Sequence, residues 1–441
     1  MTIEDDLLQG SASYDYKFSG SAGLYTMEWP SQSVHARISR LNTNRNHEVK
    51  GEVVFTSSRP TSAGHLRQGQ FSLTSPTSRR SIAKSLEERD ATVDWDTVME
   101  QLCVEVLGEY RRGSPVVEIA GDDDVEARNQ WLVEPLIEYR HPTVVYGPGA
   151  SGKSWLAQYV AVLADAGVST TGLSVEPSRC LYLDWETDEN EISARVTLLR
   201  RGLGLQGKSH ILYKRMEQAM VHDLEEIHSL VVEREVTLLV IDSIGSACMG
   251  EPENAQVVLD LFGALRTLRT TSLSIDHTNK GGELFGSAYK FNQARQLFEI
   301  KKNAQGPGEN QMLIGLFHRK HNNSPMIRDM GFELTFGPGD VTIKRQDVRE
   351  SGLEEHMRIV DRIENLLRRG AMTAFDIAET LEKTESHVRN QLSTHREKFV
   401  RIDDPANREP SRYANRLAEQ EKIAVAGAML KEEEERPQEW L

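Results

Sequence analysis

One eight-residue stretch constrains the fold of this chain more than any other. Residues 147–154 read Gly-Pro-Gly-Ala-Ser-Gly-Lys-Ser and fill every fixed position of the pattern GxxxxGK[ST]. An apolar run at 143–146 precedes them, and apolar residues at helical spacing follow from Leu156. A strand before and a helix after are the context in which this pattern forms a phosphate-binding loop. The alternative is a glycine-rich turn formed by chance, but such a turn requires neither a strand before it nor a helix after it.

Each residue type in this loop has a physical reason to be there. Glycines let successive backbone N–H groups, and the N-terminus of the following helix, face phosphate oxygens. Lys153 is expected to reach the terminal phosphates and the Ser154 hydroxyl to ligate Mg²⁺. The sequence therefore predicts a site for ATP and Mg²⁺ made by Gly147, Pro148, Gly149, Ala150, Ser151, Gly152, Lys153, Ser154 and Trp155.

Two further apolar runs lead into acidic residues. Residues 236–241 are almost wholly apolar, as in a parallel strand covered on both faces, and Asp242 follows them. In a chain with a phosphate loop, such an acid is expected to hold the metal's water shell. Residues 180–183 lead in the same way into Asp184 and Glu186. Burying an unpaired ionised acid is costly, so the alternative is that both strands simply reach the surface here.

The order of these motifs resembles the RecA-like branch of P-loop ATPases (AAA family ATPases), and within it the RepA-type hexameric helicases of plasmids and phages. The resemblance covers about residues 127–336. In that group a strand end similar to "YLDxE" carries the catalytic glutamate. The resemblance therefore implies that Glu186 orients or deprotonates the attacking water, with Asp184 structural. We expect strand 180–184 to lie directly beside the strand that leads into the phosphate loop.

Three later motifs extend the resemblance. "SLSIDHTNKGG" resembles the family's strand ending in histidine and implies that His277 senses the γ-phosphate. "GSAYKFNQARQLFEI" implies Arg295 as an arginine finger, and "LFHRKHNNSP" implies a catalytic role for Lys320. Alternatively, His277 is an ordinary strand-end histidine, Arg295 a surface partner of an acid, and Arg319 does the work of Lys320. The family usually has two adjacent histidines where this chain has Asp276 and His277.

These assignments carry an expectation about assembly. A finger must come from a neighbouring subunit to reach the nucleotide, so Arg295 implies a homo-oligomer. The family resemblance predicts a hexamer.

The stretch 277–291 is a candidate contact for single-stranded DNA. In RecA-like motors the corresponding loop faces the central channel, and lysines with aromatic residues suit phosphate attraction and base stacking. The alternative is a flexible surface loop without a ligand. The candidate lysines are Lys280 and Lys290, among the aromatic residues Phe285, Tyr289 and Phe291.

Residues 355–416 predict a second nucleic-acid contact. Apolar residues at helical spacing indicate three helices, and "FVRIDDPANREPSRYAN" fits a hairpin after them. The pattern resembles a winged helix-turn-helix, whose third helix would present Arg389 and Arg396 to DNA. The alternative is a winged helix that docks on a protein.

The fold class expected is α/β, with a RecA-like P-loop core between two smaller domains. Short, partly alternating apolar runs before residue 90 indicate a β-rich domain, and helical spacing from Trp95 indicates a helix that closes it. The expected divisions are a β-rich N-terminal domain at 1–112, an acidic linker at 113–130, the ATPase core at 131–350, the winged helix at 355–416 and an acidic tail at 417–441.

Composition narrows the compartment and the partners. The net charge of −15 argues against a protein that coats nucleic acid through bulk charge. Neither a membrane span nor a signal peptide is indicated, so we expect a soluble cytoplasmic protein without membrane contact. The three cysteines are expected to be buried free thiols.

The sequence as a whole predicts an ATP-hydrolysing motor on DNA. A replicative helicase or a repair or recombination ATPase of a phage, plasmid or bacterium is the main expectation. The alternative is a regulator in which ATP gates DNA or protein binding by the winged helix without unwinding. A metabolic phosphate-transfer enzyme is a third alternative, for which the sequence offers no acceptor-substrate lid.

Overall fold

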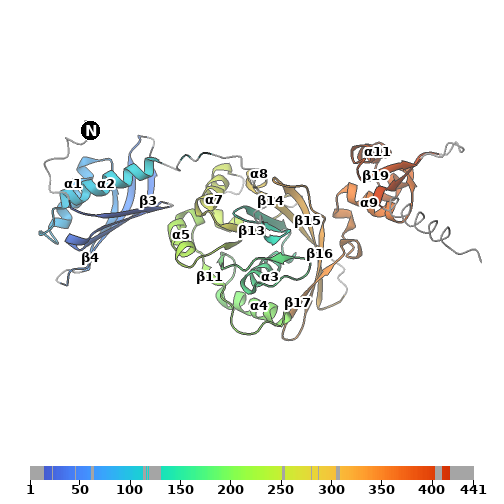
Figure 1. Ribbon diagram of the computed structural model, residues 1–441, viewed down its shortest axis with the longest axis horizontal. Coiled ribbons are helices and arrows are strands. Elements are labelled where there is room, and N and C mark those ends of the chain that lie inside the picture. The colour runs from blue at the N-terminus through green and yellow to red at the C-terminus, as the bar shows by residue number, and fades with distance from the viewer. Residues whose placement is uncertain are drawn as a thin grey trace, which may run out of the picture. The chain divides into compact units, whose positions relative to one another are not determined.

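A computed structural model describes residues 14–417 of the 441-residue chain (Figure 1). Lys280, most of the expected linker 113–130 and the tail 418–441 lie outside the described residues. The chain divides into two compact units: residues up to Leu297 without Ala150–Gly152, and Ala150–Gly152 with Phe298 onwards. Within 14–417, the residues not described are 22, 45, 61–63, 113–115, 117, 119–130, 251–253, 280, 287, 304–307 and 403–409.

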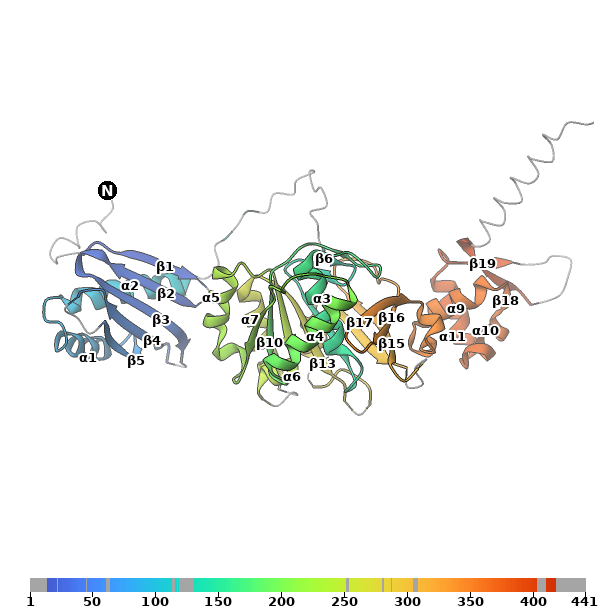
Figure 2. The ribbon, with the colours of Figure 1, turned by 90° about the horizontal axis from the view of Figure 1, so that it is seen from below.

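The N-terminal part of the first unit is an antiparallel sheet with two helices. Burial alternates along β4 because one face of the sheet is covered. The helices α1 and α2 pack on each other, and α1 also contacts β5 (Figure 2). The sheet order is β1 (Lys17–Ser21), β2 (Leu24–Trp29), β3 (Val34–Thr43), β4 (Val49–Ser57) and β5 (His65–Ser72), followed by α1 (Pro76–Glu87) and α2 (Trp95–Arg112).

The core of the first unit is a parallel sheet of five strands, and all but the edge strand β11 are buried along almost their whole length. Such strands need cover on both faces, and helices lie on both sides of them (Figure 1). The strand order is β11 (Leu212–Arg215), β10 (Cys180–Asp184), β12 (Leu238–Asp242), β13 (Thr271–His277) and β8 (Pro142–Gly147). The helices are α3 (Lys153–Ala166), α4 (Glu189–Gly202), α5 (Leu224–Glu233), α6 (Ile244–Cys248), α7 (Ala255–Leu268) and α8 (Tyr289–Gln293).

This order corrects one expectation from the sequence. β10 does not lie beside β8, because β12 and β13 separate the two strands. All five strands are parallel, so their carboxyl ends still meet at one edge. A small second sheet in the same unit has the order β7 (Ile137–Glu138), β6 (Trp131–Glu134) and β9 (Ser174–Val175).

The second unit begins with four strands in sequence order. β16 is antiparallel to both β15 and β17, as short connections allow. They are β14 (Gln296–Lys302), whose first two residues belong to the first unit, β15 (Gln311–His321), β16 (Met330–Phe336) and β17 (Val341–Gln346).

The C-terminal module of the second unit is small and has its own apolar core. Its helix α10 starts with a capping box, in which the Thr373 hydroxyl accepts from Asp376 N and the Asp376 carboxylate accepts from Thr373 N. Its elements are α9 (Ile359–Arg368), β18 (Met372–Thr373), α10 (Ala374–Leu381), α11 (Glu385–Thr394), β19 (Phe399–Ile402) and β20 (Arg412–Asn415), with sheet order β18-β20-β19.

Two features are absent from the part of the chain that the structure describes. No helix there is both long and apolar enough to cross a membrane. The three cysteines, all described, are buried and form no disulfide.

Candidate active site

The phosphate loop connects β8 to α3, with its lysine turned inward. Lys153 is buried, and its Nζ donates to the carbonyls of Gly147 at 2.9 Å and Pro148 at 2.7 Å. Burial lowers the pKa of Lys153, while Glu186, Asp242 and Asp276 act in the opposite direction. The ammonium therefore lies within the field of three carboxylates: Asp242 on β12, Asp276 on β13 and Glu186 just after β10.

Backbone geometry explains one glycine of this loop. Gly152 has φ of +91°, a conformation that side-chain-bearing residues rarely adopt. A Cβ there would also lie 3.2 Å from Met312 Sδ and 3.3 Å from Ile314 Cγ2. Gly152 is thus needed both for the turn and for close packing.

Asp242 ends β12 in a buried, polar position. The Tyr182 hydroxyl donates to Asp242 Oδ2 at 2.6 Å, while Asp242 Oδ1 is buried and has no hydrogen-bond partner among the described residues. Burial raises the pKa of Asp242 to about 6, opposed by the hydrogen bond from Tyr182 and by the nearby Ser154.

This arrangement fits Mg²⁺. An unpartnered buried carboxylate oxygen calls for a hydrogen-bond donor, and a metal-bound water supplies one. Ser154 and Asp242 are therefore the residues that would hold the ion, which keeps several waters in sites of this kind. The described residues contain no group of three or more His, Cys, Asp and Glu side chains placed to bind a metal alone.

Asp184 builds the turn that carries Glu186. Its side chain is fully buried and accepts hydrogen bonds from the backbone N–H groups of Glu186 at 3.0 Å and Thr187 at 3.2 Å. It also accepts from the hydroxyls of Thr187 at 2.7 Å and Tyr213 at 3.1 Å. These donors offset the cost of burying the acid. The register pairs Asp184 with Asp242, so the two strands end side by side.

Glu186 points to the same edge. Ser243 Oγ donates to Glu186 Oε1 at 2.6 Å, and His277 Nε2 lies 3.4 Å from that oxygen. His277 lowers the pKa of Glu186 most, and with Ser243 and Lys153 it brings the pKa to about 2 despite partial burial. A carboxylate of this pKa is ionised at neutral pH. It is well suited to accept a hydrogen bond from water but is a weak base.

The β13–β8 register explains why His277 is here. It pairs His277 with Gly147, the first residue of the phosphate loop. The structure thus brings Lys153, Ser154, Asp242, Glu186 and His277 to one edge of the sheet.

Other candidates lie elsewhere. Arg295 is exposed, and its backbone N donates to the carbonyl of Pro142, at the end of β8 opposite the phosphate loop. The rise along β8 puts these two ends about 16 Å apart. Lys320 is half-buried on β15 in the second unit, and its neighbour Arg319 is paired with Glu299 at 2.7 Å.

The structure contradicts one DNA-binding candidate. Lys290 is fully buried, and its Nζ lies 2.7 Å from Asp276 Oδ2. A lysine without accessible surface cannot meet a phosphate backbone, so the prediction for Lys290 was wrong. Lys280, the other lysine predicted there, lies outside the described residues.

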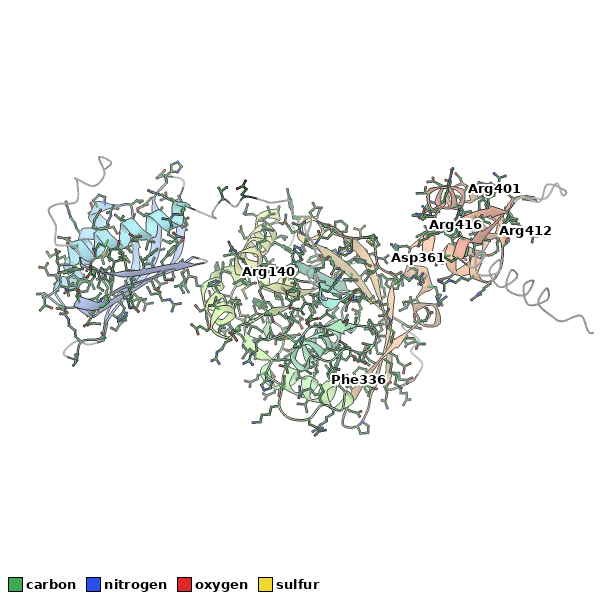
Figure 3. All side chains as sticks on the ribbon, viewed as in Figure 1. Arg140, Phe336, Asp361, Arg401, Arg412 and Arg416 are labelled. Carbon is green, nitrogen blue, oxygen red and sulfur yellow. The ribbon has the colours of Figure 1, made fainter. Side chains whose placement is uncertain are left out.

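The C-terminal candidates are on the surface but make local contacts. Arg389 Nε donates to Glu385 Oε1 at 2.8 Å, one turn earlier on α11, and Arg396 Nε donates to the Ser393 carbonyl at 3.2 Å. The hairpin β19–β20 and the residue after it add arginines that sequence reasoning did not single out, Arg401, Arg412 and Arg416, labelled in Figure 3.

Sequence reasoning also missed Tyr182 and Ser243. Tyr182 lies inside an apolar run, and Ser243 follows Asp242 as an ordinary small residue. No sequence pattern marks either residue as a partner of an active-site acid. Their roles come from strand order, which places β10 and β12 together.

The phosphate loop, the buried parallel sheet and the acids at its edge define a class of site, that of a P-loop nucleotide-binding protein. β13 lies between β8 and β12, so one strand separates the phosphate-loop strand from the strand that ends in Asp242.

Part of the chain matches a known protein family. The AAA domain family matches residues 109–283. The structure is also similar to that of a KaiC-like protein from the hyperthermophilic archaeon Pyrococcus horikoshii, with 17% sequence identity and a TM-score of 0.36 over 48% of this chain and 93% of that protein. No curated protein matches this chain in sequence.

Proposed function

We propose that this protein hydrolyses ATP at the edge of the core sheet. The observation that carries the proposal is that Lys153, Asp242 and Glu186, from three separate segments, are close enough to act on one another's charge. Lys153 and Ser154 would bind the phosphates and Mg²⁺, with Asp242 holding the metal's water. The bound ion would neutralise charge on the β- and γ-phosphates.

Glu186 would then place the attacking water. Its low pKa favours orienting that water over removing its proton in the ground state. His277, beside Gly147 and Glu186, is positioned to connect the γ-phosphate with Glu186.

We further propose that hydrolysis drives a motor on DNA, a replicative helicase or a repair or recombination ATPase. Support comes from the resemblance to RepA-type helicases and from the order of elements in the C-terminal module, which is the order of a winged helix-turn-helix. Arg295 lies at the wrong end of β8 to reach its own phosphate loop. Its proposed role as a finger therefore needs a ring of subunits, with Lys320 as a second candidate.

The second candidate function is an ATP-gated regulator that binds DNA or protein without unwinding. The burial of Lys290 favours it, because stretch 277–291 then offers DNA less positive charge than the sequence suggested.

One experiment separates these proposals. We expect the purified protein to hydrolyse ATP, the Lys153→Ala variant not to, and single-stranded DNA to raise the wild-type rate. Equal rates for wild type and variant would contradict the ATPase proposal. If hydrolysis occurs but single-stranded DNA has no effect, while duplex DNA binds through residues 355–416, the regulator is the correct function.

A further inference from the structure

The buried ion pair between Asp276 and Lys290 has no role in the proposed phosphate chemistry. Both side chains are 1% exposed, and Lys290 Nζ lies 2.7 Å from Asp276 Oδ2. Removing two charges from water is costly, and a buried pair often stabilises a protein no more than apolar residues would. Its position therefore needs a different explanation from stability alone.

The two residues of the pair lie at the two ends of one loop. Asp276 is the next-to-last residue of β13, and Lys290 is the second residue of α8. Between them the chain folds back on itself: Phe285 N donates to the His277 carbonyl at 3.0 Å, and Thr278 pairs with Leu284. The ion pair thus closes this loop, residues 277–289, at its base.

A continuous set of contacts leads from the pair to the active site. Asp276 Oδ1, the oxygen not facing Lys290, accepts from His277 N at 2.9 Å. The His277 ring in turn lies 3.4 Å from Glu186 Oε1. Moving Asp276 would therefore move the backbone that aims His277 at Glu186.

Asp276 is 1% exposed and lies near the end of a strand that is buried along almost its whole length. An aspartate in such an apolar position needs a buried cation, and Lys290 supplies one from α8.

We propose that Lys290 is a positioning residue for ATP hydrolysis: through Asp276 it holds His277 against Glu186 and fixes α8 to the catalytic edge of the sheet. This inference rests on the proposed ATPase function. Tyr289 and Phe291, on either side of Lys290, are each 43% exposed. A ligand that contacts Tyr289 or Phe291 would therefore act on α8, which the Lys290–Asp276 pair connects through His277 to Glu186.

The test uses a charge-free double variant, because either single substitution leaves a lone buried charge that destabilises the fold. In full-length D276N/K290M we expect an unchanged melting temperature within a few degrees and a KM for ATP within about twofold of wild type. We expect kcat to fall about tenfold or more, since misplacing a positioned group by ~1 Å costs up to ~100-fold. A wild-type kcat in the folded double variant would overturn the proposal.

A second measurement does not depend on catalysis. We expect amide hydrogen exchange over residues 277–291 to be faster in D276N/K290M than in wild type, with exchange over 143–166 unchanged. Unchanged exchange over 277–291 would overturn the inference even if the protein had no ATPase activity, whereas an inactive wild type with faster exchange in the variant would contradict only the proposed function.

A matched control shows that the effect is local. Arg200 on α4 makes a largely buried ion pair with Asp165 on α3 at 3.6 Å in the same unit. The matched double variant D165N/R200M should keep the wild-type kcat and the wild-type exchange over 277–291. A fall in kcat as large as that of D276N/K290M would assign both effects to general loosening of the core and overturn the positioning role.

Discussion

Asp184 and Glu186 are two positions apart and have different environments. Asp184 is saturated with donors from its own turn and from Tyr213, whereas Glu186 is 35% exposed and receives one hydroxyl, that of Ser243, with His277 beside it. The first is therefore structural and the second is available to a substrate.

The first prediction concerns Glu186. The Glu186→Gln variant should bind ATP as wild type does, because the phosphate loop is unchanged and Lys153 keeps the field of Asp242 and Asp276. Its turnover should fall ~10²-fold or more. Nucleotide binding by fluorescence titration and steady-state ATPase rates provide the measurements. Glu189→Gln, an exposed residue at the start of α4, is the matched control and should retain full turnover. Normal turnover in Glu186→Gln would remove the role proposed for this residue.

The second prediction follows from the raised pKa of Asp242, about 6. As pH falls through 6, Asp242 takes up a proton and loses its attraction for the metal, so the Mg²⁺ concentration for half-maximal ATPase rate should rise. Glu186, with a pKa of about 2, stays ionised over this range and does not contribute.

The Tyr182→Phe variant tests whether Asp242 is the group that causes this change in Mg²⁺ dependence at low pH. The hydrogen bond from Tyr182 lowers the pKa of Asp242, so its removal should shift the Mg²⁺ dependence to higher pH. Titrations of ATPase rate against Mg²⁺ at several pH values measure the shift. An identical pH dependence in the variant would show that a group other than Asp242 controls the Mg²⁺ dependence.

At the scale of elements, motifs were predictable and neighbours were not. Each of the strands before the phosphate loop and before Asp242 is marked by an apolar run, followed directly in the sequence by the motif that it positions. That β12 and β13 separate β10 from β8 depends on how helices cross the sheet, which no local pattern records. Lys290 was predicted to contact DNA because lysines among aromatic residues suit phosphate attraction and base stacking. No local pattern shows that its partner is Asp276, which is 14 positions away.

Helix α1 was missed for a related reason. The sequence before residue 90 was expected to be β-rich, yet residues 76–87 form a helix with Ser75 as its N-cap and Pro76 at its first turn. Both are regular start signals. The helix buries only Ile82, Ala83 and Leu86, so its apolar period was too weak to find among the serines and arginines around it.

The third prediction concerns the capping box of α10. Thr373→Ala removes the hydroxyl that accepts from Asp376 N and should destabilise this helix by about 1 kcal/mol, or roughly fivefold faster amide exchange over 374–381. Thr380→Ala, whose hydroxyl only donates back to the Asp376 carbonyl within the same helix, is the control and should leave exchange nearly unchanged. Equal effects of the two variants would contradict the capping role.

At the scale of the whole molecule, the position of Arg295 makes a prediction about assembly. If this residue completes the active site of a neighbour, Arg295→Ala and Glu186→Gln should each be poorly active alone. Mixed subunits should recover activity, because some interfaces then pair an intact Glu186 with an intact Arg295 across a head-to-tail contact. ATPase assays of the mixture, beside a mass measurement of the assembly, provide the test. A monomeric mass, or no recovery on mixing, would contradict the finger.

The contacts of Lys153 have a consequence for how the loop receives a nucleotide. Two of the three N–H donors of its ammonium bind carbonyl oxygens of the loop, which leaves one donor for a phosphate oxygen. The long side chain is thus already held in place, so a nucleotide does not have to order it on binding.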